Sequence, residues 1–126
     1  MRYFFIMFSC VFLSCAQTTK DGVTILDPIK FEEKIKDENV QLVDVRTPNE
    51  WENGVIANPL KIDFLESSFK EKIEKLDKTK PIAIYCKSGG RSGQAAKLLS
   101  ELGFKEVYDL KGGILNDYIS TLSKLF

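Results

Sequence analysis

Residues 81–99, PIAIYCKSGGRSGQAAKLL, place an apolar run, a glycine-rich turn and a helical pattern in direct succession. The run 82–85 predicts a buried strand, and the apolar residues of 95–102 recur at helical spacing. The turn between them begins with Cys86. Such a turn can direct several backbone N–H groups at one centre, and the N-terminus of the following helix adds positive potential. It is suited to an anion or a thiolate, so we expect the pKa of Cys86 to be lowered.

The size and charge of the chain suit one globular domain. It has 126 residues, of which 44% are hydrophobic and 29% are charged. A domain of this size can bury a substantial core. The 18 basic and 18 acidic residues give zero formal net charge, so nothing indicates a nucleic-acid partner. Any preference for anions must therefore be local.

The first 14 residues have the features of an export signal. One positive charge, Arg2, precedes an apolar stretch of roughly ten residues, which is too short to span a bilayer comfortably. A buried N-terminal helix or strand is the alternative, but the stretch lacks amphipathic periodicity and polar residues follow it. We therefore expect a signal peptide at 1–14, a short flexible tether at 15–22 and the folded domain at 23–126.

The segment FLSC, residues 12–15, resembles a bacterial lipoprotein signal, in which the cysteine is lipidated and becomes the mature N-terminus. Phe12 departs from the usual leucine, and secretion without a lipid is the alternative. The resemblance implies a protein of the cell envelope that is anchored to a membrane by lipid on Cys15 and faces the periplasm or the outside. Cys10 lies inside the apolar stretch and fits less well. Removal of Cys10 and acylation of Cys15 would leave Cys86 as the one free thiol.

Strand and helix signals alternate on both sides of the Cys86 turn. Apolar or extended segments lie at 23–26, 40–45, 60–62, 82–85 and 107–110, and helical patterns at 28–37, 48–51, 69–76, 90–102 and from 115 onward. This alternation predicts an α/β domain with a mostly parallel central sheet. Ligands of such sheets bind at the carboxyl ends of strands, which is where the Cys86 turn lies.

The absence of histidine narrows the chemistry open to Cys86. No histidine occurs in the chain, which excludes a Cys–His protease pair and histidine metal ligands. Backbone amides, the helix N-terminus and the cations Lys87 and Arg91 could stabilise a thiolate without a histidine base, provided that Gly89 and Gly90 adopt positive φ angles. The turn alone leaves open that Cys86 is an inert buried cysteine before an ordinary glycine turn.

Three segments resemble the signatures of single-domain rhodaneses, a sulfurtransferase family. DVRTPNEW at 44–51 with GVI at 54–56 resembles the first signature, CKSGGRS at 86–92 the active loop, and LKGGI at 110–114 the segment leading into the last helix. All three occur in the family's order and spacing. The resemblance implies a rhodanese-like three-layer domain, with a mostly parallel central sheet flanked by helices, that acts as a monomer without metal or organic cofactor.

The resemblance also implies roles for the residues of the active loop. Cys86 would accept a sulfane sulfur, become a persulfide and pass the sulfur to a thiol or cyanide-like acceptor. The expected substrate-binding residues are Lys87, Ser88, Gly89, Gly90, Arg91 and Ser92. Their backbone amides would stabilise negative charge, and Arg91 with Lys87 would attract a small anionic donor such as thiosulfate. Lys87 is equally well interpreted as a solvated surface cation.

Residues outside the loop are expected to support it. Asp44 and Arg46 are interpreted as a structural ion pair or hydrogen-bonded anchor, and Trp51 as a core or rim aromatic. Val55 stands where the family commonly has histidine, and Asp117 where a tryptophan often closes the last motif. We expect these two departures to alter packing or substrate approach rather than to abolish activity, with the neighbouring Tyr118 supplying an aromatic ring.

Loop length separates sulfur transfer from phosphate chemistry. Cys86 and Arg91 enclose four residues, whereas phosphatases of the Cys-x5-Arg type use a wider cradle for a tetrahedral phosphate. The shorter ring suits a persulfide sulfur and argues against a phosphatase or arsenate reductase. A non-enzymatic persulfide carrier or a partner-docking module remains the alternative to a sulfurtransferase.

Overall fold

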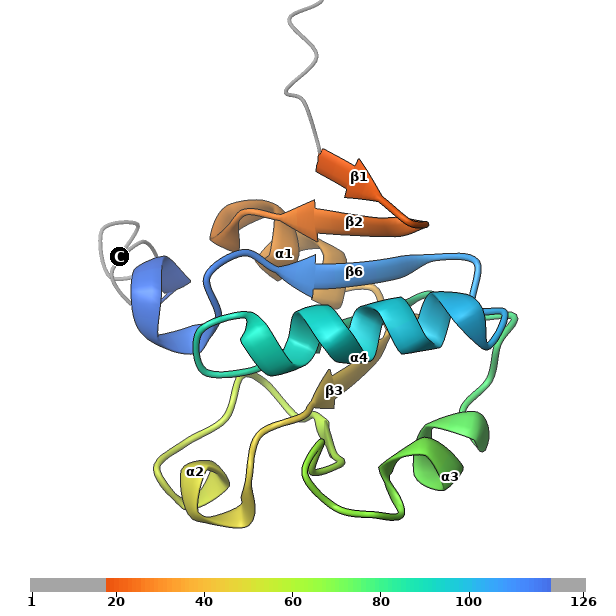
Figure 1. Ribbon diagram of the computed structural model, residues 1–126. Coiled ribbons are helices and arrows are strands. Elements are labelled where there is room, and N and C mark those ends of the chain that lie inside the picture. Colours follow the sequence, from red (N-terminus) through yellow and green to blue (C-terminus); the bar gives the residue numbers. More distant parts are fainter. Residues whose placement is uncertain (1–17, 119–126) are drawn as a thin grey trace, which may run out of the picture.

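A six-stranded sheet forms the middle layer of the protein in the computed structural model, which describes residues 18–118 (Figure 1). Its strands are β1 (Thr18–Lys20), β2 (Val23–Leu26), β3 (Gln41–Asp44), β4 (Leu60–Lys61), β5 (Ile82–Tyr85) and β6 (Val107–Leu110). They lie in the order β1-β2-β6-β5-β3-β4, and every neighbouring pair except β1 and β2 is parallel. The mostly parallel sheet predicted from the sequence is confirmed.

Helices cover both faces of this sheet (Figure 1). One face carries α1 (Pro28–Ile35) and a π-helical turn, η1 (Ile114–Tyr118), and the other carries α3 (Phe69–Glu74) and α4 (Gly90–Glu101). A short helix, α2 (Pro48–Glu52), follows β3. The last predicted helix thus begins as a π-helical turn, and its remainder lies outside the described residues.

Local capping signals set several helix ends. The Asp27 carboxylate accepts a hydrogen bond from the backbone N–H of Lys30 at 3.0 Å, with proline at the first position of α1. A capping box between Thr47 and Glu50 starts α2. Gly103 follows α4 with φ of 101°, a left-handed conformation that suits glycine. These ends were predicted correctly because each depends on residues close in sequence.

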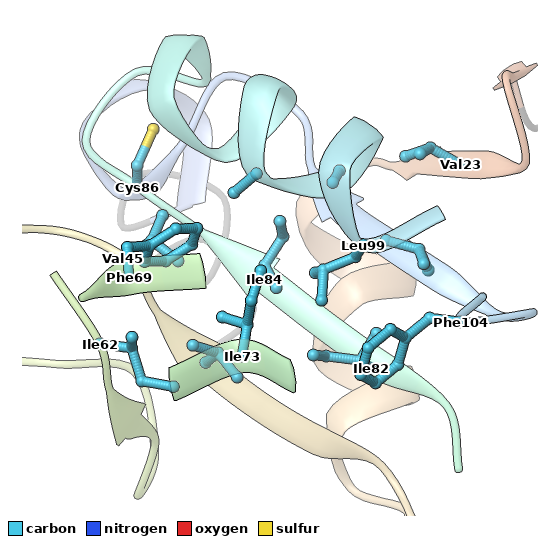
Figure 2. Packing of buried hydrophobic residues seen from close by; sticks show 14 residues of the cluster. Val23, Val45, Ile62, Phe69, Ile73, Ile82, Ile84, Cys86, Leu99 and Phe104 are labelled. Atoms are coloured by element: carbon cyan, nitrogen blue, oxygen red, sulfur yellow. The ribbon is translucent and has the colours of Figure 1, made fainter. Parts of the chain in front are cut away.

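The sheet separates two hydrophobic cores, and β5 contributes to both. Ile82 and Ile84 pack towards α3 and α4, whereas Ala83 and Tyr85 face the core under α1. All four are fully buried, which explains why this segment is apolar throughout rather than alternating. We call the core between the sheet and helices α3 and α4 the α4-side core, and the core under α1 the α1-side core. Figure 2 shows Cys86 at the end of the α4-side core. The active-loop cysteine is therefore anchored by the best-buried strand of the domain.

The beginning of the domain differs from the expected boundary. Residues 18–20, which we assigned to a flexible tether at 15–22, form β1 and pair antiparallel with β2. The structured region therefore includes part of the segment that polar composition suggested was a linker. Cys10 and Cys15, and with them the expected signal peptide and lipid site, lie outside the described residues. Within 18–118 no helix is long and apolar enough to cross a membrane.

Candidate active site

Loops from neighbouring parallel strands meet at one edge of the sheet. Because β3, β4, β5 and β6 are parallel, their carboxyl ends lie at the same edge. Arg46 follows β3, Asp63 follows β4, Cys86 directly follows β5, and Gly113 follows β6. The topology thus assembles a site from segments that are far apart in the sequence.

The sulfur of Cys86 is buried among hydrogen-bond donors. Cys86 is 1% exposed, and the backbone N–H of Gly89 lies 3.1 Å from its Sγ. Burial alone would raise the pKa of Cys86, but hydrogen bonds from the hydroxyl and backbone N–H of Ser92 and from the backbone N–H groups of Gly89 and Ser88 outweigh it and lower that pKa. The arrangement favours a thiolate, as the sequence predicted.

One glycine, not two, bends the loop around the sulfur. Gly89 has φ of 103° and ψ of −13°, a conformation that side chains rarely adopt, and it immediately precedes α4. Gly90 was also expected to need a positive φ, but its φ is not positive and it is the first residue of α4. The prediction for Gly90 was wrong because the single left-handed residue already turns the N–H groups inward.

Backbone hydrogen bonds join the segment after β6 to the active loop. The backbone N–H of Ile114 donates to the Cys86 carbonyl at 3.0 Å, and that of Leu115 donates to the Lys87 carbonyl at 3.2 Å. A Cβ atom on Gly113 would lie 2.3 Å from the Lys87 carbonyl oxygen. Gly113 is therefore required for close approach of two backbones. Sequence reasoning identified a tight connection here but not its contact with the active loop.

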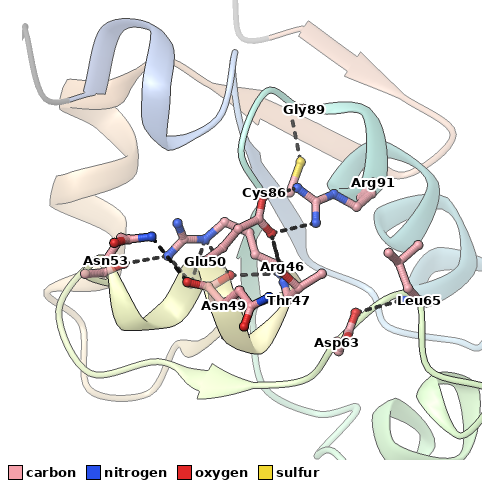
Figure 3. Close-up of polar contacts among 12 residues, drawn as sticks. Arg46, Thr47, Asn49, Glu50, Asn53, Asp63, Leu65, Cys86, Gly89 and Arg91 are labelled. Atoms are coloured by element: carbon pink, nitrogen blue, oxygen red, sulfur yellow. Dashed lines mark hydrogen bonds and ion pairs between the residues drawn. The ribbon is translucent and has the colours of Figure 1, made fainter.

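Arg91 is paired with Glu50, a residue that we did not single out from the sequence (Figure 3). Two guanidinium nitrogens of Arg91 donate to the two Glu50 carboxylate oxygens at 2.8 and 2.9 Å. The hydrogen bonds from Arg91 lower the pKa of Glu50 to about 2, and the same hydrogen bonds raise the pKa of Arg91. The expected anion-attracting cation is thus partly neutralised. Lys87 is exposed.

Asp44 and Arg46 form the predicted ion pair. Arg46 Nη2 lies 2.8 Å from Asp44 Oδ2, and the backbone N–H of Arg46 donates to Asp44 Oδ1 at 2.9 Å. The same Nη2 donates to the carbonyl of Gly54 at 2.7 Å. The pair is almost fully buried. It ties the end of β3 to the loop that follows α2.

These geometries agree with the comparison to known proteins, in which the profile of the Rhodanese-like domain family matches residues 27–117. The chain belongs to the rhodanese-like domain family. Thiosulfate sulfurtransferase GlpE of Coxiella burnetii is 41% identical over 81 residues, which cover 64% of this chain and 74% of that protein. The crystal structure of a rhodanese-related protein from Thermoplasma volcanium superposes with a TM-score of 0.66 at 34% identity, covering 76% of this chain and 90% of that one. The α/β rhodanese fold is therefore established.

In other relatives of this rhodanese-like chain, the match covers a smaller share of the protein. The tRNA uridine(34) hydroxylase of Pelagibacter ubique is 41% identical over 102 residues, which make up 79% of this chain and 33% of the hydroxylase. The match to YqhL of Bacillus subtilis covers 56% of that protein. The chain thus spans about a third and about half of these two relatives. Rhodanese-like domains also occur as parts of larger proteins.

One of the two departures from the rhodanese pattern, Val55, lies at a groove of about 350 Å³. Half-buried Val55 lines it together with Arg46, Ile114 and Tyr118. Tyr118 is buried in the α1-side core, where its hydroxyl donates to the Glu32 carboxylate, so an aromatic ring does pack here as expected. The side chain of Asp117 lies outside the described part of the structure.

Proposed function

We propose that this rhodanese-like domain is a sulfurtransferase that carries a sulfane sulfur on Cys86. The observation that supports this most is the set of donors around Sγ: a backbone N–H from Gly89 at 3.1 Å, with further hydrogen bonds from Ser88 and Ser92. They stabilise negative charge on sulfur without any histidine. The likeness to thiosulfate sulfurtransferase GlpE supports the same reaction class.

The reaction has two displacement steps at sulfur. The Cys86 thiolate attacks the outer sulfur of thiosulfate, a new S–S bond forms, the S–S bond of thiosulfate breaks, and its electron pair leaves with sulfite. The product is a Cys86 persulfide anion. A thiophilic acceptor such as cyanide then attacks the outer sulfur of the persulfide, which forms thiocyanate and returns the thiolate. Neither step requires an added oxidant, reductant or proton.

Charges around Arg91 bias the site towards an anionic donor. The Arg91 guanidinium is close enough to Cys86 for the thiolate charge to raise its pKa. Glu50 offsets part of this positive charge and orients the guanidinium. The donor therefore meets a positioned cation beside the nucleophile, and exposed Lys87 adds to the positive potential at the entrance.

Steady-state kinetics with thiosulfate and cyanide test the proposal. A ping-pong mechanism predicts parallel double-reciprocal lines, and Cys86→Ser should lose at least about a thousandfold in turnover, since the nucleophile is gone. Lys75→Ala, which removes one partner of an exposed surface pair, serves as the control and should keep wild-type rates. Equal rates for Cys86→Ser and the wild type would contradict the assignment.

A persulfide carrier is the second candidate, and the occurrence of such domains within longer relatives favours it. A carrier would form the Cys86 persulfide from thiosulfate but would show negligible turnover with cyanide. It would release the sulfur only to a protein thiol. The same assay, combined with detection of the persulfide, separates the two candidates.

We also propose that the domain is exported and lipid-anchored through Cys15. The support is the sequence alone: Arg2, an apolar stretch and the segment 12–15. Metabolic labelling with palmitate in a bacterial host should label the wild type and not Cys15→Ser. A Cys15→Ser protein that still incorporates the label would contradict the proposal. A wild type that carries no label and keeps its signal peptide would contradict it as well.

A further inference from the structure

The groove of about 350 Å³ beside Val55 has no role in the reaction described above. One of its walls is the segment 53–57, which follows α2, and the other is η1. Both walls contribute apolar side chains, Val55 from the first and Leu115 from the second. Within the described part of the chain, Arg46 is the one charged residue of the lining, and Asp44 lies 2.8 Å from it. The groove therefore suits an uncharged, apolar group rather than an ion.

Hydrogen bonds hold both walls of the groove in place. Arg46 Nη2 donates to the Gly54 carbonyl at 2.7 Å. The backbone N–H of Ile56 donates to the hydroxyl of fully buried Tyr85 at 2.9 Å. On the other wall, the backbone N–H groups of the first two residues of η1 donate to carbonyls of the active loop. The groove is thus preformed and directly adjoins the loop that carries the nucleophile.

Two groups of the lining are placed to contact a ligand. Leu115 is a large apolar side chain that is 57% exposed. Arg46 is only 5% exposed; its Nε and Nη2 atoms donate to Asp44 and Gly54, and its Nη1 has no acceptor within the described part of the chain. A ligand with an aliphatic side chain close to a carbonyl oxygen would satisfy both groups. A polypeptide offers this combination at every large aliphatic residue.

The groove and the cation Arg91 lie on different sides of the nucleophile. In Figure 3, Asn53, which lines the groove, lies to one side of Cys86, and Arg91 lies to the other. The two partners of a ping-pong reaction meet the same sulfur in turn. Arg91 serves the anionic donor, so the uncharged groove is open to an acceptor of different chemistry.

We propose that the groove binds the sulfur acceptor, and that this acceptor is a cysteine of a polypeptide with a large aliphatic residue beside it. The aliphatic side chain packs against Val55 and Leu115, and a backbone carbonyl next to the cysteine accepts a hydrogen bond from Arg46 Nη1. The proposal rests on the proposed function, because it names the acceptor of that reaction.

The transfer step balances without a further reactant. The acceptor thiolate attacks the outer sulfur of the Cys86 persulfide, and a new S–S bond forms on the acceptor. The S–S bond to Cys86 breaks, and its electron pair stays on the Cys86 sulfur as the thiolate. The acceptor leaves as a persulfide.

Discharge of the Cys86 persulfide by two peptides tests the proposal. Acetyl-Leu-Cys-Leu-amide and acetyl-Gly-Cys-Gly-amide present the same thiol between uncharged neighbours and differ in the leucine side chains. After loading with thiosulfate and removal of the excess, intact-mass spectrometry should show that the leucine peptide removes the added sulfur about tenfold faster. Equal rates would overturn the proposal, including the case in which residues 119–126 or a second copy of the chain fill the groove.

Two matched variants locate the preference. Leu115→Asn should reduce the preference for the leucine peptide to about twofold or less and leave the rate of loading by thiosulfate unchanged, since loading takes place on the Arg91 side. Leu60→Asn makes the same change at a leucine of β4 that is 48% exposed, and it should keep the tenfold preference. A preference that survives Leu115→Asn, or that both variants lose equally, would overturn the proposal.

Thiol–disulfide exchange gives the same comparison without sulfur transfer. Each peptide is activated as its 2-pyridyl disulfide; the Cys86 thiolate attacks the peptide sulfur, an S–S bond forms, and pyridine-2-thione leaves with the electron pair and is measured by its absorbance. The leucine peptide should again react about tenfold faster. A protein that keeps this preference but gains no sulfur from thiosulfate would refute the proposed function and support the docking site. Equal exchange rates would refute the docking site alone.

Discussion

Two arginines lie at the same edge of the sheet, and each forms an ion pair with a carboxylate. The two pairs differ in burial, and we infer that they differ in role for this reason. The side chains of Arg46 and Asp44 are 7% and 0% exposed, whereas those of Arg91 and Glu50 are 21% and 25% exposed. The first pair also binds a backbone carbonyl and fixes a loop. The second lies close to Cys86 and remains open to water on one side. The buried pair Arg46–Asp44 therefore stabilises the structure, whereas the partly exposed pair Arg91–Glu50 sets the charge beside Cys86.

Breaking the buried pair should have the largest effect. Arg46→Ala leaves the Asp44 carboxylate buried without its cation, so the free energy of unfolding should fall by about 3–5 kcal/mol. Urea denaturation measures it. Lys75→Ala, which breaks a pair whose side chains are both 72% exposed, should cost less than about 0.5 kcal/mol. Similar losses in the two variants would contradict the distinction drawn from burial.

Asp109 extends the comparison to a buried carboxyl that has no arginine partner among residues 18–118. Burial raises its pKa from 3.8 to about 6, so its contribution to stability is full below pH 4 and is lost as the pH rises through 6. Asp109→Asn should therefore be more stable than the wild type by up to about 3 kcal/mol at pH 8, with no difference at pH 3.5. Urea denaturation at both pH values checks this; a pH-independent difference would contradict it.

Removing the half-buried cation Arg91 should change substrate binding more than stability. We expect Arg91→Ala to raise the KM for thiosulfate about tenfold, because the dianion loses a neighbouring positive charge. The free energy of unfolding should change by less than about 1 kcal/mol. Arg91→Lys should recover part of the affinity. Initial rates across thiosulfate concentrations measure the effect, and a loss confined to turnover with an unchanged KM would oppose it.

Removing the other member of that pair should have the smallest effect and the opposite sign. Glu50→Gln keeps a hydrogen-bond acceptor for Arg91 but removes the negative charge, so the KM for thiosulfate should fall about twofold to threefold at low ionic strength. The difference should disappear at high salt. Because Arg91 lowers the pKa of Glu50 to about 2, the wild-type pair contributes stability above pH 4.5 and loses it only as the pH falls towards 2.

Much of the fold was predictable because its determinants are local. Asp27 and Pro28 mark the start of α1, and the apolar run at 82–85 marks β5, from residues within a few positions of each other. The prediction of a tether was wrong at residues 18–20 for a tertiary reason. Polar residues at 18–20 form a strand because the edge of β2 supplies backbone partners, and that edge is not visible in the composition of the segment.

The active loop could be predicted from the sequence, but the residues that pack or pair around it could not. The loop from Cys86 to Ser92 carries its own signal in glycines and spacing, and the backbone N–H of Gly89 does meet the sulfur. Glu50 was missed because it lies 41 residues from Arg91 and only the pairing of β3 with β5 brings them together. Asp109 had a signal that could have been used, a single acidic residue within an otherwise uncharged strand.

The central claim is that Cys86 holds a sulfur atom that it takes from an anionic donor. Intact-mass spectrometry of the protein after incubation with thiosulfate tests it directly. The account predicts the addition of one sulfur atom to the wild type, its localisation to Cys86 in the digested protein, and its removal by cyanide. An unchanged mass, or the same added sulfur on Cys86→Ser, would contradict it.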